Sequence, residues 1–416
     1  MPTDEPAAPR TVPDLLDAAV SRDPAATAVV DRDHRISYGE LDARSSRLAR
    51  RLAAHGIVAG TPVLVALPRS VDALVTWWAL ARLGAVFVPL GPARFPERQA
   101  YIAECSAARV GVTSLAERAG LPDTVEWFVH DDTADPGISA PITPRSARPH
   151  PDEPVHMAYS SGGTGVPKGI PHTHRTLTTL ARAYRSRFRV EPSSLVLHIA
   201  DPHHDAWLLE LLLTFGSAAT AVVVPPAVTE GEQLADFIRG ARVTHAYLAE
   251  NELLTLTATD LPDLRHLLLD ARDLTEGLAE AWSAIRTLHL SYGVPGTTVT
   301  TSGPAGAGHA PTGNSRLIGT PVDGIAAYVL DDELHPVPFG TAGDLYLGGP
   351  ALPATFHDRP DITSGRHVAI PFTRDAVPVL NTLDRVRWNH TPTGPALEHV
   401  EGPFHVHIRH GGRPRS

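Results

Sequence analysis

The stretch Y-S-S-G-G-T-G-V-P-K-G at residues 159–169 governs how the rest of the chain is interpreted. It follows an apolar run at residues 155–159 that predicts a buried strand, and a helical pattern begins soon after it at His174. Three glycines in four residues leave backbone N–H groups free to turn toward an anion. A strand, a Gly-rich loop with a lysine and a helix commonly hold the phosphates of a nucleoside triphosphate. We therefore predict a phosphate-binding loop at this point of the chain.

The lysine of this loop, Lys168, is the only lysine among the 36 lysines and arginines of the chain. Arginine stays protonated and cannot replace lysine as a tunable amine, which excludes any mechanism that needs two lysines from this chain. The Walker spacing G-x-x-x-x-G-K-[ST] is absent, because Gly169 follows Lys168, so the loop is not that of an ordinary P-loop NTPase. The alternative interpretation is a flexible turn that contains a lysine by chance.

Composition restricts the class of protein. A length of 416 residues with 43% hydrophobic and 20% charged residues is typical of a soluble globular protein with two or three subdomains. The net charge of −10 argues against nucleic acid or an anionic membrane as the main partner. The single cysteine, Cys105, cannot form an internal disulfide and fits a reducing cytoplasm. The polar, Pro-rich opening is unlike a signal peptide, and the apolar stretches are too short to span a bilayer.

Most of the chain alternates between strand and helix patterns. A strand at residues 63–67, a helix at 71–83 and a strand at 86–88 form a unit that implies a parallel sheet. Further strands are predicted at residues 110–113, 155–159, 195–199, 221–224, 244–248, 267–269 and 287–290, and helices at 37–56, 97–107, 177–187, 205–215, 230–242 and 275–284.

The pattern changes in the last quarter of the chain. Residues 325–330, 344–347, 377–381 and 385–389 predict antiparallel strands with turns between them, and thus a smaller β-rich subdomain from about residue 316. Two segments rich in Pro, Gly, Ser and Thr, at residues 132–154 and 297–315, are expected to be surface connections.

The Gly-rich loop resembles the phosphate loop of the adenylate-forming enzymes, [YF]-[ST]-S-G-[ST]-T-G-x-P-K-G, from which only Gly163 departs. Other segments resemble motifs of that family in the same order: I-S-Y-G-E-L at 36–41, L-G-A-V-F-V-P-L at 83–90, G-D-L-Y-L-G-G at 343–349 and N-T-L-D-R-V-R-W at 381–388. The resemblance covers about residues 12–410. The most similar group is the amino-acid adenylation domains of nonribosomal peptide synthetases.

The resemblance implies an α/β fold of stacked, mostly parallel sheets with flanking helices and a smaller C-terminal β-rich subdomain. It implies a leader at residues 1–11, an N-terminal adenylation core at 12–399 and a residual hinge strand at 400–416. The sequence F-H-V-H-I-R at 404–409 resembles the strand after the family's hinge, and the hinge aspartate falls at Pro403 or Phe404. We therefore expect the mobile C-terminal lid subdomain, with its catalytic lysine, to be absent from this chain.

The resemblance also assigns nucleotide-binding roles. Tyr292, in S-Y-G-V-P-G-T-T at 291–298, would stack on adenine, and Asp384 would grip both ribose hydroxyls. The alternative for Asp384 is a turn residue between two strands. ATP and Mg²⁺ are the expected cofactors, although the family glutamate that helps to hold Mg²⁺ falls at Gly296, and Leu383 replaces a glycine. The phosphates would be bound by Ser161, Gly162, Gly163, Thr164, Gly165 and Lys168, of which Thr164 and Lys168 would be catalytic.

An amino-acid pocket follows from the same resemblance. His204-Asp205 with Glu210 matches F-D-x-S-x-W-E, in which the aspartate binds the substrate's α-ammonium group; the alternative is a solvated aspartate at a helix start. Asp270 stands where small or neutral residues are common, so we expect a basic or hydroxylated substrate side chain opposite it. The pocket residues would be Asp205, Ala206, Leu209, Tyr247, Leu268, Asp270, Ser291 and Val299.

Three functional classes stay open from the sequence. The first is an amino-acid-activating core that forms an aminoacyl adenylate alone or with a lid from another chain, with a carrier protein as a further candidate partner. The second is a non-catalytic relative that binds nucleotide, amino acid or a synthetase as a scaffold. The third, a metal site at His203-His204-Asp205 or at His405 and His407, lacks a complete ligand set. A serine hydrolase is disfavoured because no G-x-S-x-G occurs.

Overall fold

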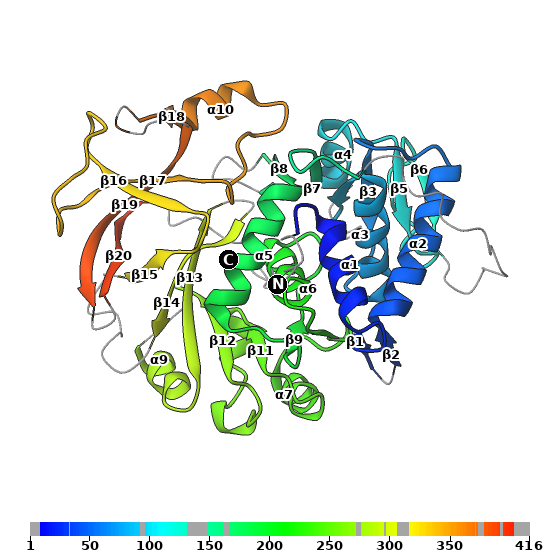
Figure 1. The fold of residues 1–416 in the computed structure, drawn as a ribbon, viewed down its shortest axis with the longest axis horizontal. Helices are drawn as coiled ribbons and strands as arrows, with labels where there is room; N and C mark the ends of the chain where they lie inside the picture. Colours follow the sequence, from blue (N-terminus) through cyan, green and yellow to red (C-terminus); the bar gives the residue numbers. More distant parts are fainter. Residues whose placement is uncertain are drawn as a thin grey trace, which may run out of the picture.

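The computed structural model describes residues 9–32, 34–91, 96–130, 148–160, 166–271, 276–294, 297–305, 316–370, 372, 378–391 and 394–402. Within these residues the strands form two sheets (Figure 1). The smaller sheet has the order β6 (Glu126–Val129), β5 (Val110–Thr113), β3 (Pro62–Ala66), β4 (Val86–Pro89), β7 (Pro154–Ser160) and β8 (Lys168–Thr173).

The smaller sheet is parallel except for β8, which runs antiparallel to β7. Helix α3 (Val71–Leu83) connects β3 to β4 and has the predicted bounds. The Ser70 hydroxyl accepts the N–H of Ala73 at its start, and Gly84 ends it with a φ of +69°. Helix α2 (Tyr38–Ala54) packs against α3, and α4 (Pro96–Cys105) follows β4. The predicted parallel unit is thus confirmed.

The first half of the larger sheet is also mostly parallel. Its order is β13 (Thr287–Val294), β12 (His266–Asp270), β11 (His245–Tyr247), β9 (Leu195–His198), β10 (Thr220–Val223), β1 (Thr27–Asp31) and β2 (His34–Ser37), with only β2 antiparallel to its neighbour. The helices of this half are α1 (Val12–Arg22), α5 (His174–Phe188), α6 (Asp205–Phe215), α7 (Gly231–Gly240), α8 (Glu250–Leu253) and α9 (Glu276–Ser283), together with a 3₁₀ turn at Ala258–Asp260.

The second half of the larger sheet is antiparallel and forms the β-rich part of the molecule, coloured yellow to red in Figure 1. It continues from β13 through β14 (Thr297–Ala305), β15 (Arg316–Pro321), β20 (Gly394–Glu401), β19 (Pro378–Thr391), β17 (Gly343–Gly348) and β16 (Ala326–Leu330). The short strand β18 (His367–Ala369) pairs with β19, and α10 (Pro360–Arg366) precedes it.

Two local predictions in this half are wrong. Residues 297–305 form a strand that pairs with β13, and not a surface connection. Their threonines, together with Ser and Gly, indicate a loop in the sequence, but threonine is β-branched and also favours a strand. The two strands predicted at 377–381 and 385–389 are one strand, β19. Leu383 has a φ of +68° at its middle, and the pairing register shifts nearby, so the chain bulges without turning back.

One hydrophobic core joins the two sheets. It includes Val63 of β3 and Phe87 of β4 on one side and Leu268 of β12 on the other. The ring of Trp207 on α6 stacks on Phe87 with a centroid distance of 5.3 Å. Helix α6 is therefore held between the sheets, and this fixes the position of its first residue. Among the described residues no helix has the length and apolarity needed to cross a membrane.

Candidate active site at the strand ends of the larger sheet

The predicted amino-acid pocket residues of β11, β12 and β13 lie on one face of the sheet. Tyr247 pairs with Leu268, and Asp270 pairs with Ser291, in a parallel register. Side chains of register partners and of every second residue point the same way, so these four share a face, and Tyr247 and Asp270 are the last residues of their strands. The carboxyl edge is where parallel sheets bind ligands. All four are buried.

Helix α6 carries the next three predicted pocket residues. Asp205 is its first residue and is half-buried, whereas Ala206 and Leu209 are buried. The helix packs against β14, the strand that contains Val299. The elements of the predicted pocket are therefore neighbours in the fold.

Glu210 fixes the loop that leads to Asp205. Its carboxyl group accepts the backbone N–H groups of Ile199 and Ala200 at 3.2 Å and is fully buried. Burial raises the pKa of Glu210 to about 8. The side chain ties the end of β9 to α6, so in this structure its role is to hold the loop and not to touch a ligand.

Asp201 in the same loop is held from the other sheet. The backbone N–H of Arg69 donates to its carboxylate at 3.2 Å, and the Arg69 guanidinium lies 3.5 Å from it. That guanidinium also donates to the carbonyl of Val224 at 2.9 Å. The loop before α6 is thereby fixed at both ends, which orients the helix N-terminus and Asp205.

Arg98 on α4 is a neighbour of Asp205 with the opposite charge. Partial burial lowers the pKa of Arg98, and the charge of Asp205 raises it. Desolvation lowers the pKa of His204 to about 3, so its ring is neutral at physiological pH. The rings of His203 and His204 lie 4.0 Å apart. Among the described residues no group of three or more His, Cys, Asp or Glu side chains could hold a metal ion, and His405 and His407 lie outside them.

The two predicted adenosine-binding residues are in direct contact. The hydroxyl of Tyr292 on β13 donates to Oδ2 of Asp384 on β19 at 2.7 Å, and both side chains are buried. Burial, followed by the negative charge of Asp384, raises the pKa of Tyr292 well above its usual range, so the phenol stays protonated and donates. Asp384 is not a turn residue, since it lies within the long strand β19.

Lys168 begins β8 and is half-buried. Partial burial lowers its pKa, Arg366 and Arg359 lower it further, and Asp361 raises it. Two arginines near the predicted phosphate lysine make this region positive, which suits a polyphosphate. The other predicted phosphate-binding residues, Ser161, Gly162, Gly163, Thr164 and Gly165, lie outside the described residues, as does Gly296.

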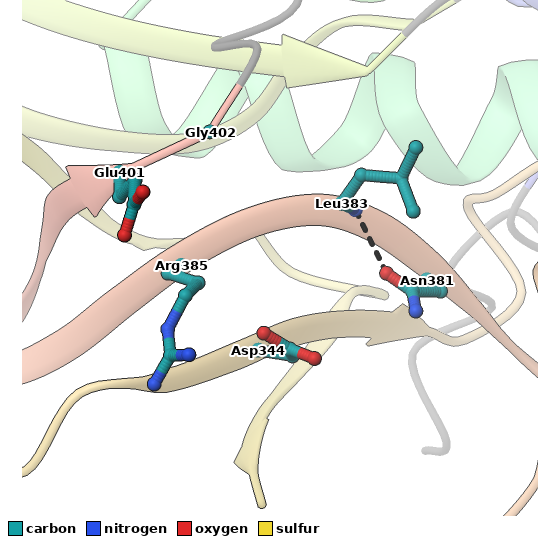
Figure 2. A pocket seen from close by; sticks show the side chains of 6 residues that line it. All are labelled: Asp344, Asn381, Leu383, Arg385, Glu401 and Gly402. Carbon is teal, nitrogen blue, oxygen red and sulfur yellow. Dashed lines mark hydrogen bonds between the residues drawn. The ribbon is translucent and has the colours of Figure 1, made fainter. Parts of the chain in front are cut away.

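A pocket of about 340 Å³ lies beside the nucleotide residues without containing any of them. Figure 2 shows it between β17, β19 and the end of β20, lined by Asp344, Asn381, Leu383, Arg385, Glu401 and Gly402. Leu383 and Arg385 are exposed on either side of the buried Asp384 along the strand. The pocket therefore occupies the outer face of β19, and Asp384 points to the inner face.

The sequence matches the family described as AMP-binding enzyme over residues 16–355. The chain belongs to this family. It is 37% identical over 390 residues to phosphinothricin tripeptide synthetase PhsC of Streptomyces viridochromogenes, covering 92% of this chain and 36% of PhsC. It is 33% identical over 392 residues to novobiocin biosynthesis protein H of Streptomyces niveus, covering 90% of this chain and 63% of that protein. The chain thus spans about a third to two thirds of the length of these relatives.

Solved structures agree with the AMP-binding family in fold. The chain superposes with a TM-score of 0.79 on the NpsA N-terminal subdomain of Klebsiella oxytoca in complex with 3-hydroxybenzoyl-AMSN, at 21% identity, covering 93% of this chain and 98% of that one. It superposes with a TM-score of 0.82 on NpsA-ThdA, an artificially fused adenylation–PCP di-domain from the same organism, at 20% identity, covering 95% and 79%. The architecture is therefore that of an adenylate-forming N-terminal core.

Sequence reasoning missed several residues of this AMP-binding core. Nε2 of His399 on β20 lies 3.3 Å from Oδ1 of Asp384. Arg359 and Arg366 near Lys168 were also not singled out. The pairing of Thr391 with Gly394 in the β19–β20 hairpin places His399 opposite Val386, and thus close to Asp384. The sequence could have indicated this contact only if the ends of the two strands had been known.

Proposed function

We propose that this chain binds ATP and an amino acid and joins them into an aminoacyl adenylate with release of pyrophosphate. The observation that carries the proposal is the position of Ser291 and Tyr292 on β13. They are consecutive residues and thus face opposite sides of one strand. Ser291 belongs to the predicted amino-acid pocket and Tyr292 to the predicted nucleotide site. Because the two residues are adjacent on β13, the substrate's carboxylate and the α-phosphate of ATP would meet at this strand, with one binding residue on each side of it.

The amino acid would be held at its backbone and at its side chain. The carboxylate of Asp205, at the start of α6, would bind the α-ammonium group. The side chain would lie along Tyr247 and Leu268 toward Asp270, which is only 4% exposed. A buried carboxylate favours a partner that is positive or donates hydrogen bonds, so a basic or hydroxylated side chain is the proposed substrate class.

The nucleotide would lie across β13 and β19. The ring of Tyr292 offers a face to adenine, and Asp384 offers carboxylate oxygens to the ribose hydroxyls. Lys168, with Arg366 and Arg359 nearby, would face the phosphates together with the loop residues 161–165. Mg²⁺ would take most of its ligands from the phosphates and water, as it commonly does at nucleotide sites.

The reaction itself needs positioning and charge neutralisation. A carboxylate oxygen of the amino acid attacks the α-phosphorus, the bond from that phosphorus to the bridging oxygen breaks, and pyrophosphate leaves with both electrons. Negative charge develops on the transferred phosphoryl group and on the leaving pyrophosphate. A fixed cation such as Lys168 stabilises that charge more in the transition state than in free ATP.

A second function is favoured by a different observation. Tyr292 and Asp384 are both buried and bonded to each other, so a nucleotide could reach them only after the groups that cover the pair move. A core that stays in this arrangement would act as a binding or scaffold partner in a biosynthetic assembly.

The relative named as an adenylation–PCP di-domain supports a carrier protein as the proposed partner for either function. The single cysteine supports the cytoplasm as the proposed location.

ATP–pyrophosphate exchange across a panel of amino acids, with and without an added C-terminal subdomain, tests the enzymatic proposal. We expect exchange with basic or hydroxylated amino acids, and a stronger signal when the C-terminal subdomain is present. Intact ATP binding with no exchange under either condition would favour the scaffold function. Asp270→Ala tests the substrate class, because an unchanged amino-acid preference in that variant contradicts it.

A further inference from the structure

We propose that His399 is a positioning residue of the nucleotide site, which holds the Asp384 carboxylate in the orientation that accepts the ribose hydroxyls. The proposal rests on the proposed nucleotide function and adds a residue to which no role was assigned. A carboxylate can only accept, so the contact of 3.3 Å between Nε2 of His399 and Oδ1 of Asp384 requires the imidazole to donate. His399 comes from β20, whereas Asp384 is on β19.

The two oxygens of Asp384 are held by two different strands. Oδ2 accepts the Tyr292 hydroxyl at 2.7 Å from β13, and Oδ1 accepts His399 from β20. An ionised carboxylate has about four acceptor positions, so two donors do not by themselves saturate it. The same contacts connect the predicted adenine-stacking ring to the predicted ribose acceptor. The orientation of one therefore depends on the other.

The backbone around Asp384 allows little adjustment. Its N–H donates to the Thr382 hydroxyl at 3.1 Å, and that hydroxyl donates to the carbonyl of Leu345 at 2.9 Å. Gly402 lies against the carboxylate so closely that a Cβ there would be 2.8 Å from Oδ1. In Figure 2 the neighbouring Leu383 donates its N–H to the side chain of Asn381, on the outer face of the strand. Once the backbone is fixed, the remaining freedom is rotation of the carboxylate, and His399 and Tyr292 restrict it.

A purely structural role for His399 makes a different prediction. If His399 only compensates a buried charge, its replacement should destabilise the fold and weaken the binding of all nucleotides by the same factor. A positioning residue should lower the affinity only for nucleotides that carry ribose hydroxyls. ATP and 2′,3′-dideoxy-ATP separate these cases, because they differ only in those hydroxyls. The ratio of their dissociation constants reports the ribose contact alone.

The experiment measures both dissociation constants by calorimetry for the full chain and its variants. We expect the wild type to favour ATP, Asp384→Asn to lose most of that preference, and His399→Phe to reduce it roughly tenfold, as for loss of a hydrogen bond to a charged group. His399→Gln should keep most of it, since an amide N–H can replace the imidazole donor. His390→Phe, an exposed histidine on the same hairpin, is the matched control and should keep the wild-type ratio.

Each other outcome overturns a defined part of the proposal. A wild-type ratio in His399→Phe, with the preference lost in Asp384→Asn, removes His399 from the site and leaves the nucleotide function intact. If His399→Phe weakens the binding of ATP and of 2′,3′-dideoxy-ATP by the same factor, His399 has a packing role only. If the wild type binds neither nucleotide, the proposed function fails and the role of His399 fails with it. His399→Leu provides a second variant without a donor if the Phe variant does not fold by circular dichroism.

Discussion

The parallel strands β11 to β13 and the antiparallel hairpin β19–β20 place their candidate site residues in different ways. Asp270 is the last residue of its strand and Ser291 lies near the carboxyl edge, where a parallel sheet leaves room for a ligand. Asp384 lies in the middle of a strand, and a bulge at Leu383 with a φ of +68° precedes it. The amino-acid side of the site therefore follows from the topology, whereas the ribose side depends on local strain and on cross-strand contacts.

The largest expected effect concerns stability in acid, and it should come from buried histidines in the parallel parts of both sheets. Burial lowers the pKa of His156, His198 and His289 to about 3 and of His245 to about 4, and desolvation lowers that of His204 to about 3. Their folded pKa values lie below the unfolded value of 6.5. The free energy of unfolding is therefore at its full value above pH 6.5 and decreases as the pH falls toward 3, because protons then bind the histidines of the unfolded chain but not those of the folded one.

Between pH 6.5 and 5 each such histidine costs up to about 2 kcal/mol. Glu210 and Glu252, with pKa values raised to about 8 and about 7, act in the opposite direction and offset two histidines. We expect the free energy of unfolding to fall by about 5 kcal/mol over this range. Urea unfolding at each pH measures it. Stability that does not change over the range would show that these histidines are not buried as neutral rings.

The next effect separates the amino-acid side from the nucleotide side. Asp205→Ala should lower the rate of amino-acid-dependent exchange at least about a hundredfold, because the α-ammonium group loses its carboxylate, and should change the ATP dissociation constant by less than about twofold. Asp384→Asn should weaken ATP binding directly. Asp236→Ala, an exposed aspartate on α7, is the control. Equal effects of the first two variants on ATP binding would contradict the division of the site.

A third prediction concerns the crowding around the ribose acceptor. Gly402→Ala should destabilise the protein by about 2 kcal/mol more than Gly394→Ala. Both glycines have a similar positive φ, +122° and +118°, but a Cβ at Gly402 would lie 2.8 Å from the Asp384 Cα, whereas Gly394 has nothing within 4 Å. The difference in urea midpoints measures the crowding without the backbone contribution. Equal losses in the two variants would mean that Asp384 is not held tightly.

The smallest effect is a gain of stability. Leu383→Gly should raise the free energy of unfolding by about 1 kcal/mol, because a leucine in the left-handed region is strained and glycine is not. Leu383 is 51% exposed, so little packing is lost. Leu254→Gly is the control, since Leu254 is exposed with a φ of −64°, and it should lose about 1 kcal/mol. A loss at Leu383 as large as at Leu254 would argue against strain beside the ribose acceptor.

The sequence predicted the parallel parts of both sheets well for physical reasons. Apolar runs of strand length alternate there with helical patterns, and clear caps such as Ser70 and Gly84 mark the ends of α3. The predicted pocket residues of β11, β12 and β13 then share an edge because parallel strands end together. The helix start at Asp205 is confirmed, and the role of Glu210 as an anchor for the preceding loop was visible only in three dimensions.

The antiparallel half was predicted less completely. A bulge at Leu383 has no sequence signature, since a leucine with positive φ is rare, so β19 was divided into two strands. His399 was missed because its contact with Asp384 depends on the register of the hairpin, with Val386 opposite His399. The roles of Ser161, Gly162, Gly163, Thr164 and Gly165 remain predictions from the resemblance.

The most direct test of adenylate formation is whether one molecule can occupy both halves of the site. Aminoacyl sulfamoyl-adenosines carrying lysine, arginine, serine or leucine link the two halves in the geometry of the adenylate. If both halves meet at Ser291 and Tyr292 of β13, the preferred compound should bind at least about a hundredfold more tightly than AMP, and the basic or hydroxylated compounds should bind more tightly than the leucine compound. If none of the four binds more tightly than AMP, the two halves do not form one site and the adenylate-forming proposal is wrong.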